Sequence, residues 1–228
     1  MKIHAITVAA GNGTRFGSAT PKQFLPIGGT PVAIRAVMAL RKAIPTLTDT
    51  IVLAETQVDR WLDLCRRHNI SSPAIAIGGD TRFDSVRNAL ASVDPAADVV
   101  LVHDGARPFP SAGMIRRIVE AFERGDVDGA IPAIHVTDSI RKTTGGETSV
   151  KVDRSLLRAV QTPQAFIRQR LLQAYLLASD GHLFTDDASV MENAGFNRLA
   201  LVDGDVCNIK ITNPVDIDVA EAILRHIQ

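Results

Sequence analysis

Residues 3–17 read IHAITVAAGNGTRFG, an apolar run that leads directly into a loop containing three glycines. The run from Ile3 to Ala10 is typical of a buried strand in a parallel sheet. The glycine loop follows the carboxyl end of that strand, which is the edge at which α/β sheets bind their ligands. This stretch therefore predicts an α/β fold with a ligand-binding loop at one edge of its sheet.

The same alternation of apolar runs and amphipathic segments continues through the first 135 residues. Further buried strands are predicted at 50–54, 73–77, 99–103 and 129–133. One helix is predicted to start at Pro31 with Thr30 as its cap, and others to cover 60–69, 83–92 and 112–124. Strand and helix in alternation predict a mainly parallel, Rossmann-like sheet with helices on both faces.

The pattern changes after Ala133. Residues 136–152 carry the turn sequence TTGGE at 143–147 between two β-prone stretches, which predicts a projecting hairpin. Helices are predicted again at 167–179 and 186–194, and a last one is predicted to start at Asn213-Pro214. No repeat or interdomain linker interrupts the chain. We therefore expect one domain over residues 1–228, with 136–152 as an arm.

The predicted arm at 136–152 indicates that the protein forms a dimer. A two-stranded ribbon is only marginally stable in water unless it packs against something. The equivalent ribbon of a second subunit is its natural support, which would give an isologous homodimer. We therefore interpret residues 136–152 as a dimerisation arm.

Composition excludes several classes of protein. The chain has 25 Lys and Arg against 25 Asp and Glu, so it lacks the basic excess of a protein that coats nucleic acid. It contains no run of 18 apolar residues, and no signal peptide fits before Ile3, so no membrane association is expected. Cys65 and Cys207 have no Cys or His at ligand spacing, which argues against a disulfide framework or a zinc site. These features predict a protein of the reducing cytoplasm.

The glycine loop carries two cations, Arg15 inside it and Lys22 seven residues later. Small residues allow backbone N–H groups to approach phosphate oxygens. The loop lacks the Lys-Ser or Lys-Thr pair of a Walker loop, and Phe16 stands where a dinucleotide fingerprint needs its third glycine. We interpret it as a triphosphate loop whose cations offset charge at a phosphorus under attack. The alternative is a tight turn with two solvated cations.

Several motifs together carry a resemblance to a known family. Residues 9–17 and the sequence PKQ at 21–23 resemble the signature of sugar-phosphate nucleotidyltransferases. The resemblance narrows with GGDTRFDSV at 78–86, HDGARP at 103–108, VDR at 152–154, TPQ at 162–164 and NIKIT at 208–212. In this order, over nearly the whole chain, they resemble the 2-C-methyl-D-erythritol 4-phosphate cytidylyltransferases of non-mevalonate isoprenoid biosynthesis. The resemblance implies an enzyme that transfers CMP from CTP to that polyol phosphate and releases pyrophosphate.

The resemblance also implies roles for individual residues. The catalytic cations would be Arg15, Lys22 and Lys210. CTP would contact Ala9, Ala10, Gly11, Gly13, Gly79, Asp80, Ser85 and Gly105, the last at a position where the family commonly has alanine. The polyol phosphate would contact Asp104, Arg107, Arg154, Thr162 and Lys210, with Arg154 supplied by the partner subunit. Mg²⁺ would sit mainly on the triphosphate, and whether any side chain binds it is left open.

Each motif also has a plainer interpretation. Asp104 and Arg107 could form a buried ion pair that closes a loop, and Arg154 could be a solvated hairpin cation. Lys210 lies in an alternating, strand-like run, where an inward lysine needs an anionic partner. His103 is predicted to be packed rather than a base. The sequence TDDA at 185–188 resembles a further stretch of the family, but Thr185 as a helix cap explains it equally well. Two alternative functions remain: cytidylyl transfer to another polyol phosphate such as ribitol 5-phosphate, and a non-catalytic nucleotide-sensing module.

Overall fold

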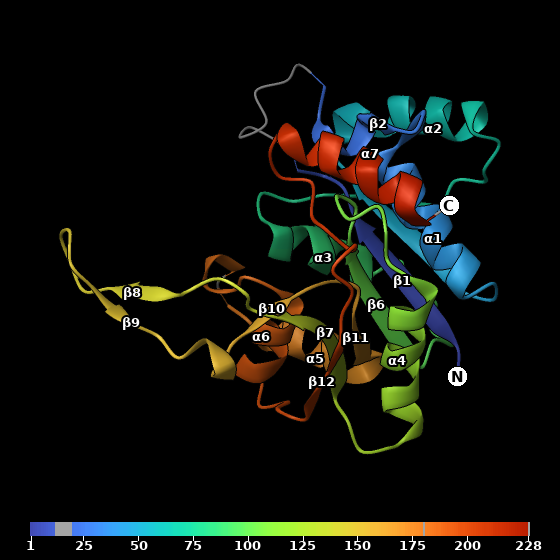
Figure 1. The fold of residues 1–228 in the computed structure, drawn as a ribbon. Helices are drawn as coiled ribbons and strands as arrows, with labels where there is room; N and C mark the ends of the chain where they lie inside the picture. The colour runs from blue at the N-terminus through green and yellow to red at the C-terminus, as the bar shows by residue number, and fades with distance from the viewer. Residues whose placement is uncertain (12–19, 180, 228) are drawn as a thin grey trace.

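The computed structural model describes residues 1–11, 20–179 and 181–227 and has an eight-stranded sheet at its centre (Figure 1). The strand order is β10-β7-β11-β6-β1-β4-β5, with β12 paired to β7. The strands are β1 (Ile3–Val8), β4 (Thr48–Leu53), β5 (Ala74–Ile77), β6 (Val99–Asp104), β7 (Gly129–His135), β10 (Arg158–Val160), β11 (Gln164–Ile167) and β12 (Leu199–Asp203).

The sheet is mainly parallel, as predicted. β1 lies between β4 and β6 and is parallel to both, β5 is parallel to β4, and β12 is parallel to β7. β11 runs antiparallel to both β6 and β7, and β10 runs antiparallel to β7. The five predicted strands are present within a few residues of their expected bounds. The other three, β10, β11 and β12, were not predicted.

Helices cover both faces of the sheet. They are α1 (Val32–Ala43), α2 (Val58–Arg67), α3 (Arg82–Leu90), α4 (Ala112–Glu123), α5 (Arg168–Leu177), α6 (Asp187–Asn193) and α7 (Val215–Ile227). Because successive strand residues point to opposite faces, Ile6 packs with α3, α5 and α6, while Ala5 packs with α1 and α4. None of the helices in the described ranges is both long and apolar enough to cross a bilayer.

The predicted hairpin is present and projects from the body of the molecule (Figure 1). β8 (Arg141–Thr143) and β9 (Ser149–Lys151) pair antiparallel across a turn in which Gly145 and Gly146 have φ of 100° and 59°. These angles lie in the left-handed region that glycine adopts without strain. The three side chains of β8 are exposed, so the arm does not pack on its own subunit there.

Three local predictions were wrong. α1 begins at Val32 after Pro31, and Thr30 instead belongs to the short strand β3 (Thr30–Pro31), which pairs with β2 (Pro26–Ile27). α6 is capped by Asp186, whose carboxylate accepts the N–H of Ser189 at 3.0 Å, rather than by Thr185. The run 208–212 is not a strand, although the Ile211 N–H does donate to the Ala106 carbonyl at 2.9 Å.

Candidate active site

A cavity of about 360 Å³ opens at the carboxyl edge of the sheet, beyond the ends of β1, β5 and β6. It brings together many of the predicted nucleotide and catalytic residues. These are Ala9, Ala10, Gly11, Lys22, Gly79, Asp80, Ser85, Asp104 and Lys210, joined by Val8, Gln23, Thr81, Arg82 and Ala106. The predicted residues Gly13 and Arg15 lie outside the described part of the chain. We call this space the nucleotide cavity.

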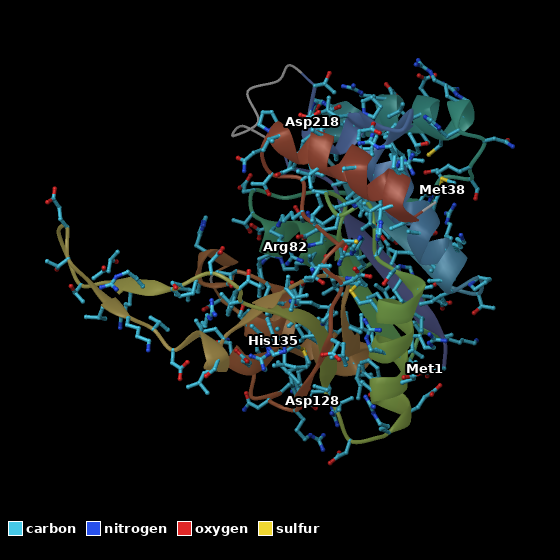
Figure 2. All side chains as sticks on the ribbon, in the orientation of Figure 1. Met1, Met38, Arg82, Asp128, His135 and Asp218 are labelled. Atoms are coloured by element: carbon cyan, nitrogen blue, oxygen red, sulfur yellow. The ribbon has the colours of Figure 1, made fainter. Side chains whose placement is uncertain are left out.

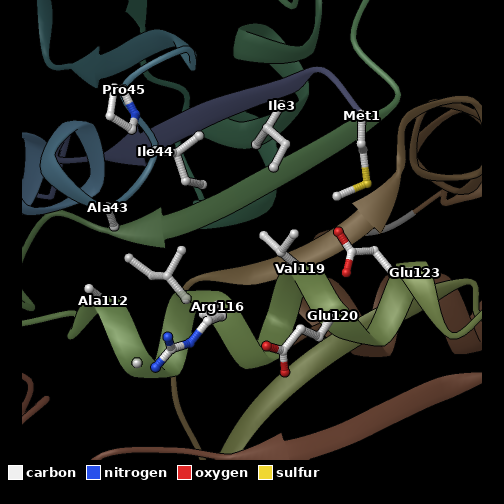
Figure 3. Close-up of a pocket in the computed structure, with 12 residues that line it drawn as sticks. Met1, Ile3, Ala43, Ile44, Pro45, Ala112, Arg116, Val119, Glu120 and Glu123 are labelled. Atoms are coloured by element: carbon white, nitrogen blue, oxygen red, sulfur yellow. The ribbon is translucent and has the colours of Figure 1, made fainter.

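A larger hollow of about 670 Å³ lies elsewhere, between the end of α1, the start of β1 and α4 (Figure 3). It is lined by apolar side chains such as Ile44 and Val119, with Arg116, Glu120 and Glu123 along α4. It contains none of the residues that the sequence motifs single out. The chemistry of the lining, rather than the size of the cavity, therefore identifies the candidate site.

Gln23 ties the glycine loop to the segment that carries Lys22. Its buried side-chain amide donates to the carbonyl oxygens of Ala9, at 2.8 Å, and Gly11, at 3.0 Å. Gln23 belongs to the short 3-10 helix η2 (Lys22–Phe24). The two bonds hold the start of η2 against the end of β1, which places Lys22 on the cavity wall. The sequence motif contained Gln23 without assigning it this role.

Close backbone approach shapes the opposite side of the cavity. A Cβ on Gly78 would lie 2.4 Å from the Ala10 Cβ, and one on Gly79 would lie 2.4 Å from the Asp84 Cβ. Both distances are far below van der Waals contact, so only glycine fits at either position. The Gly79 N–H also donates to the Ser85 hydroxyl at 3.1 Å. The glycines thus bring the loop before α3 into contact with both the first strand and the helix.

Asp104 is the electrostatic centre of the site. Its carboxylate accepts from Arg82 Nε at 3.2 Å and from Lys210 Nζ at 2.8 Å, and Arg107 Nε lies 4.0 Å away. Burial alone would raise its pKa, but the charges of Arg82 and Lys210 hold that pKa well below its ordinary value. Asp104 is therefore an anion throughout the physiological range. It is also the anionic partner that the sequence analysis required for Lys210.

A second cavity of about 290 Å³ lies on the other side of Asp104. Its lining includes the predicted residues Asp104, Arg107, Thr162 and Lys210, together with Arg82, Val160, Gln161, Gln164, Thr185 and Asp186. Arg82, Asp104 and Lys210 line both cavities and form a common wall. Arg107 donates through Nη1 to the Asn208 carbonyl at 2.7 Å, but its buried Nε has no hydrogen-bond partner within the described ranges. We call this space the acceptor cavity.

Arg154 is not brought to either cavity in the described part of its own chain. It lies at the base of the arm, in the 3-10 helix η4 (Arg154–Leu156), and donates to the Thr137 carbonyl. It lines a separate hollow with Ser139, Ile140, Arg141, Lys151, Val152 and Asp153. Its role in binding the substrate of a partner subunit stays a prediction.

Thr162 and His103 form a buried chain of hydrogen bonds behind Asp104. The Thr162 hydroxyl accepts the Asp104 N–H at 2.9 Å and lies 3.1 Å from His103 Nδ1, while His103 Nε2 lies 3.0 Å from the Arg107 carbonyl. A carbonyl can only accept, so Nε2 carries the proton and Nδ1 is the acceptor for the Thr162 hydroxyl. His103 is thus a packed, neutral residue, as predicted. Thr162 positions Asp104 as well as lining the acceptor cavity.

His103 predicts a pH dependence of stability. Burial lowers its pKa from 6.5 to about 4, so below pH 6.5 the unfolded chain binds a proton that the folded chain does not. The free energy of unfolding is therefore expected to fall between pH 6.5 and about 4, by roughly 2 to 4 kcal/mol from this residue. Urea unfolding of wild type and His103→Gln at a series of pH values measures this. Buried His4 contributes equally to both proteins, and equal slopes would contradict the assignment.

Gly105 does not line the nucleotide cavity but packs against Val8 and Ala9, which do. Its N–H donates to the Val8 carbonyl at 2.8 Å, and a Cβ there would lie 3.0 Å from both the Val8 oxygen and the Ala9 Cβ. The neighbouring Ala106 lines the cavity in its place. The absence of a side chain at Gly105 therefore allows β6 to pack tightly beside the end of β1.

The described residues do not form a site for a resident metal ion. No group of three or more His, Cys, Asp or Glu side chains in these ranges is arranged to hold one. The carboxylate nearest both cavities, Asp104, already accepts from Arg82 and Lys210, and a hard cation would have to compete with both.

Comparisons with known proteins agree with this geometry. The chain matches the family model described as IspD: 2-C-methyl-D-erythritol 4-phosphate cytidylyltransferase over residues 3–226. A protein of that name from Bacteroides thetaiotaomicron is 44% identical over 227 residues, which cover 98% of this chain and 100% of the relative. A relative of the same name from Bacteroides fragilis is 45% identical, with 96% of this chain and 98% of the relative covered.

Solved structures give the same result. The crystal structure of 2-C-methyl-D-erythritol 4-phosphate cytidylyltransferase from Thermus thermophilus is 31% identical with a TM-score of 0.77, covering 99% of this chain and 100% of that one. The 4-diphosphocytidyl-2C-methyl-D-erythritol synthase from Anaerococcus prevotii is 26% identical with a TM-score of 0.81, covering 98% of both chains. The match extends over the strands, the glycine loop, the arm and the segment that carries Lys210, and the chain belongs to the 2-C-methyl-D-erythritol 4-phosphate cytidylyltransferase family.

Proposed function

We propose that this chain transfers the cytidylyl group of CTP to 2-C-methyl-D-erythritol 4-phosphate and releases pyrophosphate, as a step in isoprenoid biosynthesis. The observation that carries the proposal is the wall of Arg82, Asp104 and Lys210 shared by two cavities. A nucleotide in one cavity and a phosphorylated polyol in the other would meet at this wall. The names of the relatives supply the identities of the transferred group and of the acceptor.

The reaction is a direct, in-line displacement. An oxygen of the polyol phosphate attacks the α-phosphorus of CTP, and a new P–O bond forms. The bond between that phosphorus and the oxygen bridging to the β-phosphate breaks, and pyrophosphate leaves with the electron pair. The attacking phosphate is already anionic near neutral pH, so no side chain has to act as nucleophile or base. The obstacle is the approach of two anions, which cations relieve.

Two cations among the described residues support this mechanism. Lys22 and Lys210 both line the nucleotide cavity, and the 2.8 Å contact with Asp104 holds the Lys210 ammonium at the shared wall. By resemblance Arg15 would join them from the glycine loop. Arg107 lines the acceptor cavity and adds positive charge on the side of the incoming phosphate. Mg²⁺ enters as part of the substrate, Mg–CTP, and neutralises charge on the triphosphate.

The proposed function is tested by pyrophosphate release from Mg–CTP in the presence of candidate acceptors. We expect turnover with 2-C-methyl-D-erythritol 4-phosphate and a product whose ³¹P spectrum shows a diphosphate. Faster turnover with ribitol 5-phosphate would instead support the alternative acceptor. CTP binding without release from any polyol phosphate would support the nucleotide-sensing alternative. The family match favours the first outcome.

The nucleotide cavity predicts base selectivity. Gly79, Asp80 and Ser85 line the part of the cavity that the resemblance assigns to the base. CTP is expected to react faster than UTP, and GTP or ATP to react at least about a hundredfold more slowly, because a buried polar site rejects a base that leaves it unpaired. Pyrophosphate release with each of the four triphosphates at equal concentration measures this. Equal rates with GTP and CTP would contradict the assignment of the base pocket.

The proposal includes a homodimer that works in the cytoplasm. The arm projects into solvent, and Arg154 at its base is exposed and lies outside both cavities of its own described chain (Figure 1). An arm that packs on a second subunit would carry this arginine toward the partner's acceptor cavity. The partner's polyol phosphate would then be oriented by Arg154, and catalysis would depend on dimerisation.

A further inference from the structure

A buried polar network lies directly behind the shared wall. The Asp187 side chain, at the start of α6, is completely buried. One of its oxygens accepts from the Tyr175 hydroxyl of α5 at 2.6 Å, and the other accepts from Arg82 Nη2 of α3 at 2.7 Å. Arg82 then reaches Asp104 through Nε at 3.2 Å. Side chains from three helices thus form a chain of hydrogen bonds that ends at the Asp104 carboxylate.

The planar geometry of the Arg82 guanidinium couples its contact with Asp187 to its contact with Asp104. The guanidinium is a rigid plane, so the contact of Nη2 with Asp187 restricts where Nε can point. Tyr175 is fixed in turn because its ring stacks on Phe83, with centroids 4.7 Å apart. Asp187 has only these two described partners to offset its burial, so a change in either is transmitted to the other.

Arg82 is exposed to both cavities, whereas Tyr175 and Asp187, which hold it in place, are not. Arg82 lines both cavities, and Figure 2 shows it near the centre of the view. Tyr175 and Asp187 line neither cavity within the part of the chain that is described. The side-chain hydrogen bonds that connect Tyr175 to both cavities run through Asp187 and Arg82 to Asp104.

We propose that Arg82 is a positioning residue: anchored by Asp187 and Tyr175, it sets the orientation of Asp104 and thereby holds Lys210 at the wall between the two substrates. This inference rests on the proposed placement of CTP and the polyol phosphate in the two cavities. It assigns the buried hydroxyl and carboxylate a role in catalysis, although neither touches a substrate. The network acts by fixing the Lys210 ammonium beside the phosphorus at which one group attacks and the other leaves.

The first test uses the smallest change, Tyr175→Phe. The variant keeps the ring that stacks on Phe83 and removes only the hydroxyl that holds Asp187. We expect kcat to fall about 3- to 10-fold while KM for CTP stays within about twofold, because misplacement of a transition-state group acts on kcat. Arg82→Lys keeps the charge but loses the planar double contact, and its kcat is expected to fall about 10- to 100-fold.

The matched control is Arg170→Lys. Arg170 lies on α5, as Tyr175 does, and pairs with the buried carboxylate of Asp128, outside both cavities in the described ranges. Figure 2 shows Asp128 at the lower end of the view, away from Arg82. This variant is expected to lose thermal stability as Arg82→Lys does and to retain kcat within about twofold. An equal loss of kcat in both would reduce the role of Arg82 to a structural one and overturn the inference.

A spectroscopic test uses the fact that Tyr175 is the single tyrosine of the chain. Protein grown with 3-fluorotyrosine has one ¹⁹F resonance, which reports on the hydroxyl bonded to Asp187. We expect this resonance to shift when the polyol phosphate is added to the complex with a non-hydrolysable CTP analogue. The shift should persist in Arg170→Lys and disappear in Arg82→Lys, because Arg82 is the connection to the cavities.

The experiments distinguish a failure of the proposed function from a failure of the positioning role of Arg82. If the wild-type enzyme releases no pyrophosphate, the proposed function itself is wrong. If it is active but folded Tyr175→Phe has wild-type kcat, or the ¹⁹F resonance does not respond to the polyol phosphate, the positioning role is wrong and the function stands. Should Arg82→Lys fail to fold, Tyr175→Phe and Asp187→Asn still decide the question.

Discussion

Replacement of Lys22 by alanine is expected to lower kcat by about two to three orders of magnitude, the effect of removing one preorganised charge donor from a transition state. Lys22 lines the nucleotide cavity, and the segment that carries it is fixed by the two bonds from Gln23 to the glycine loop. KM for CTP should rise much less than kcat falls, because the ammonium is needed most as charge moves onto the leaving pyrophosphate.

Steady-state pyrophosphate release at saturating polyol phosphate measures both constants. Lys42→Ala is the matched control, since Lys42 is an exposed lysine of α1 that lies outside both cavities. The control should keep wild-type kcat. If Lys22→Ala also keeps it, Lys22 is a solvated loop cation, and the catalytic charge must come from elsewhere.

Much of the fold could be predicted from sequence because its centre is built from local signals. β1, β4, β5, β6 and β7 are apolar runs followed by turns, and each was expected within a few residues of where it lies. β10 could not be found in this way, because all three of its residues are exposed and its pairing with β7 joins segments distant in sequence. β11 pairs with β6 and β7, and β12 pairs with β7, so these strands too are defined by partners distant in sequence.

In the candidate site too, residues marked by local sequence signals were predicted, and residues joined by long-range contacts were not. Motifs adjacent to strand ends were found, so the residues around Ala9, Gly79 and Asp104 were expected and do lie together. Arg82 was part of a quoted motif, but its pairing with Asp187 spans 105 positions, and no periodicity indicates such a contact. Asp187 also resembles an ordinary acidic residue in the first turn of a helix. Sequence patterns therefore indicated the substrate-facing residues and missed those that support them from behind.

The second large effect concerns the arm. If Arg154 completes the partner's acceptor cavity, Arg154→Ala and Lys22→Ala homodimers should each be nearly inactive, and mixing them should restore activity. In a mixed dimer, the Arg154→Ala subunit keeps its own Lys22 and receives an intact Arg154 from its partner. The other site lacks both cations. Each mixed dimer therefore has one complete site, and random exchange makes about half of the dimers mixed, so activity should recover to about a quarter of wild type.

The two variants need different affinity tags, so that isolated mixed dimers can be assayed and are expected to show about half of wild-type activity. Arg154 suits the experiment because it is exposed, lies in η4 at the base of the arm and contributes to neither cavity of its own described chain, so its loss should not disturb folding. Arg158→Ala, which removes an exposed arginine of β10, serves as the control for the arginine itself. Isolated mixed dimers that remain inactive would mean that Arg154 serves its own chain or has no catalytic role. Activity in the Arg154→Ala homodimer would contradict the shared site directly, since neither of its sites could receive the cation.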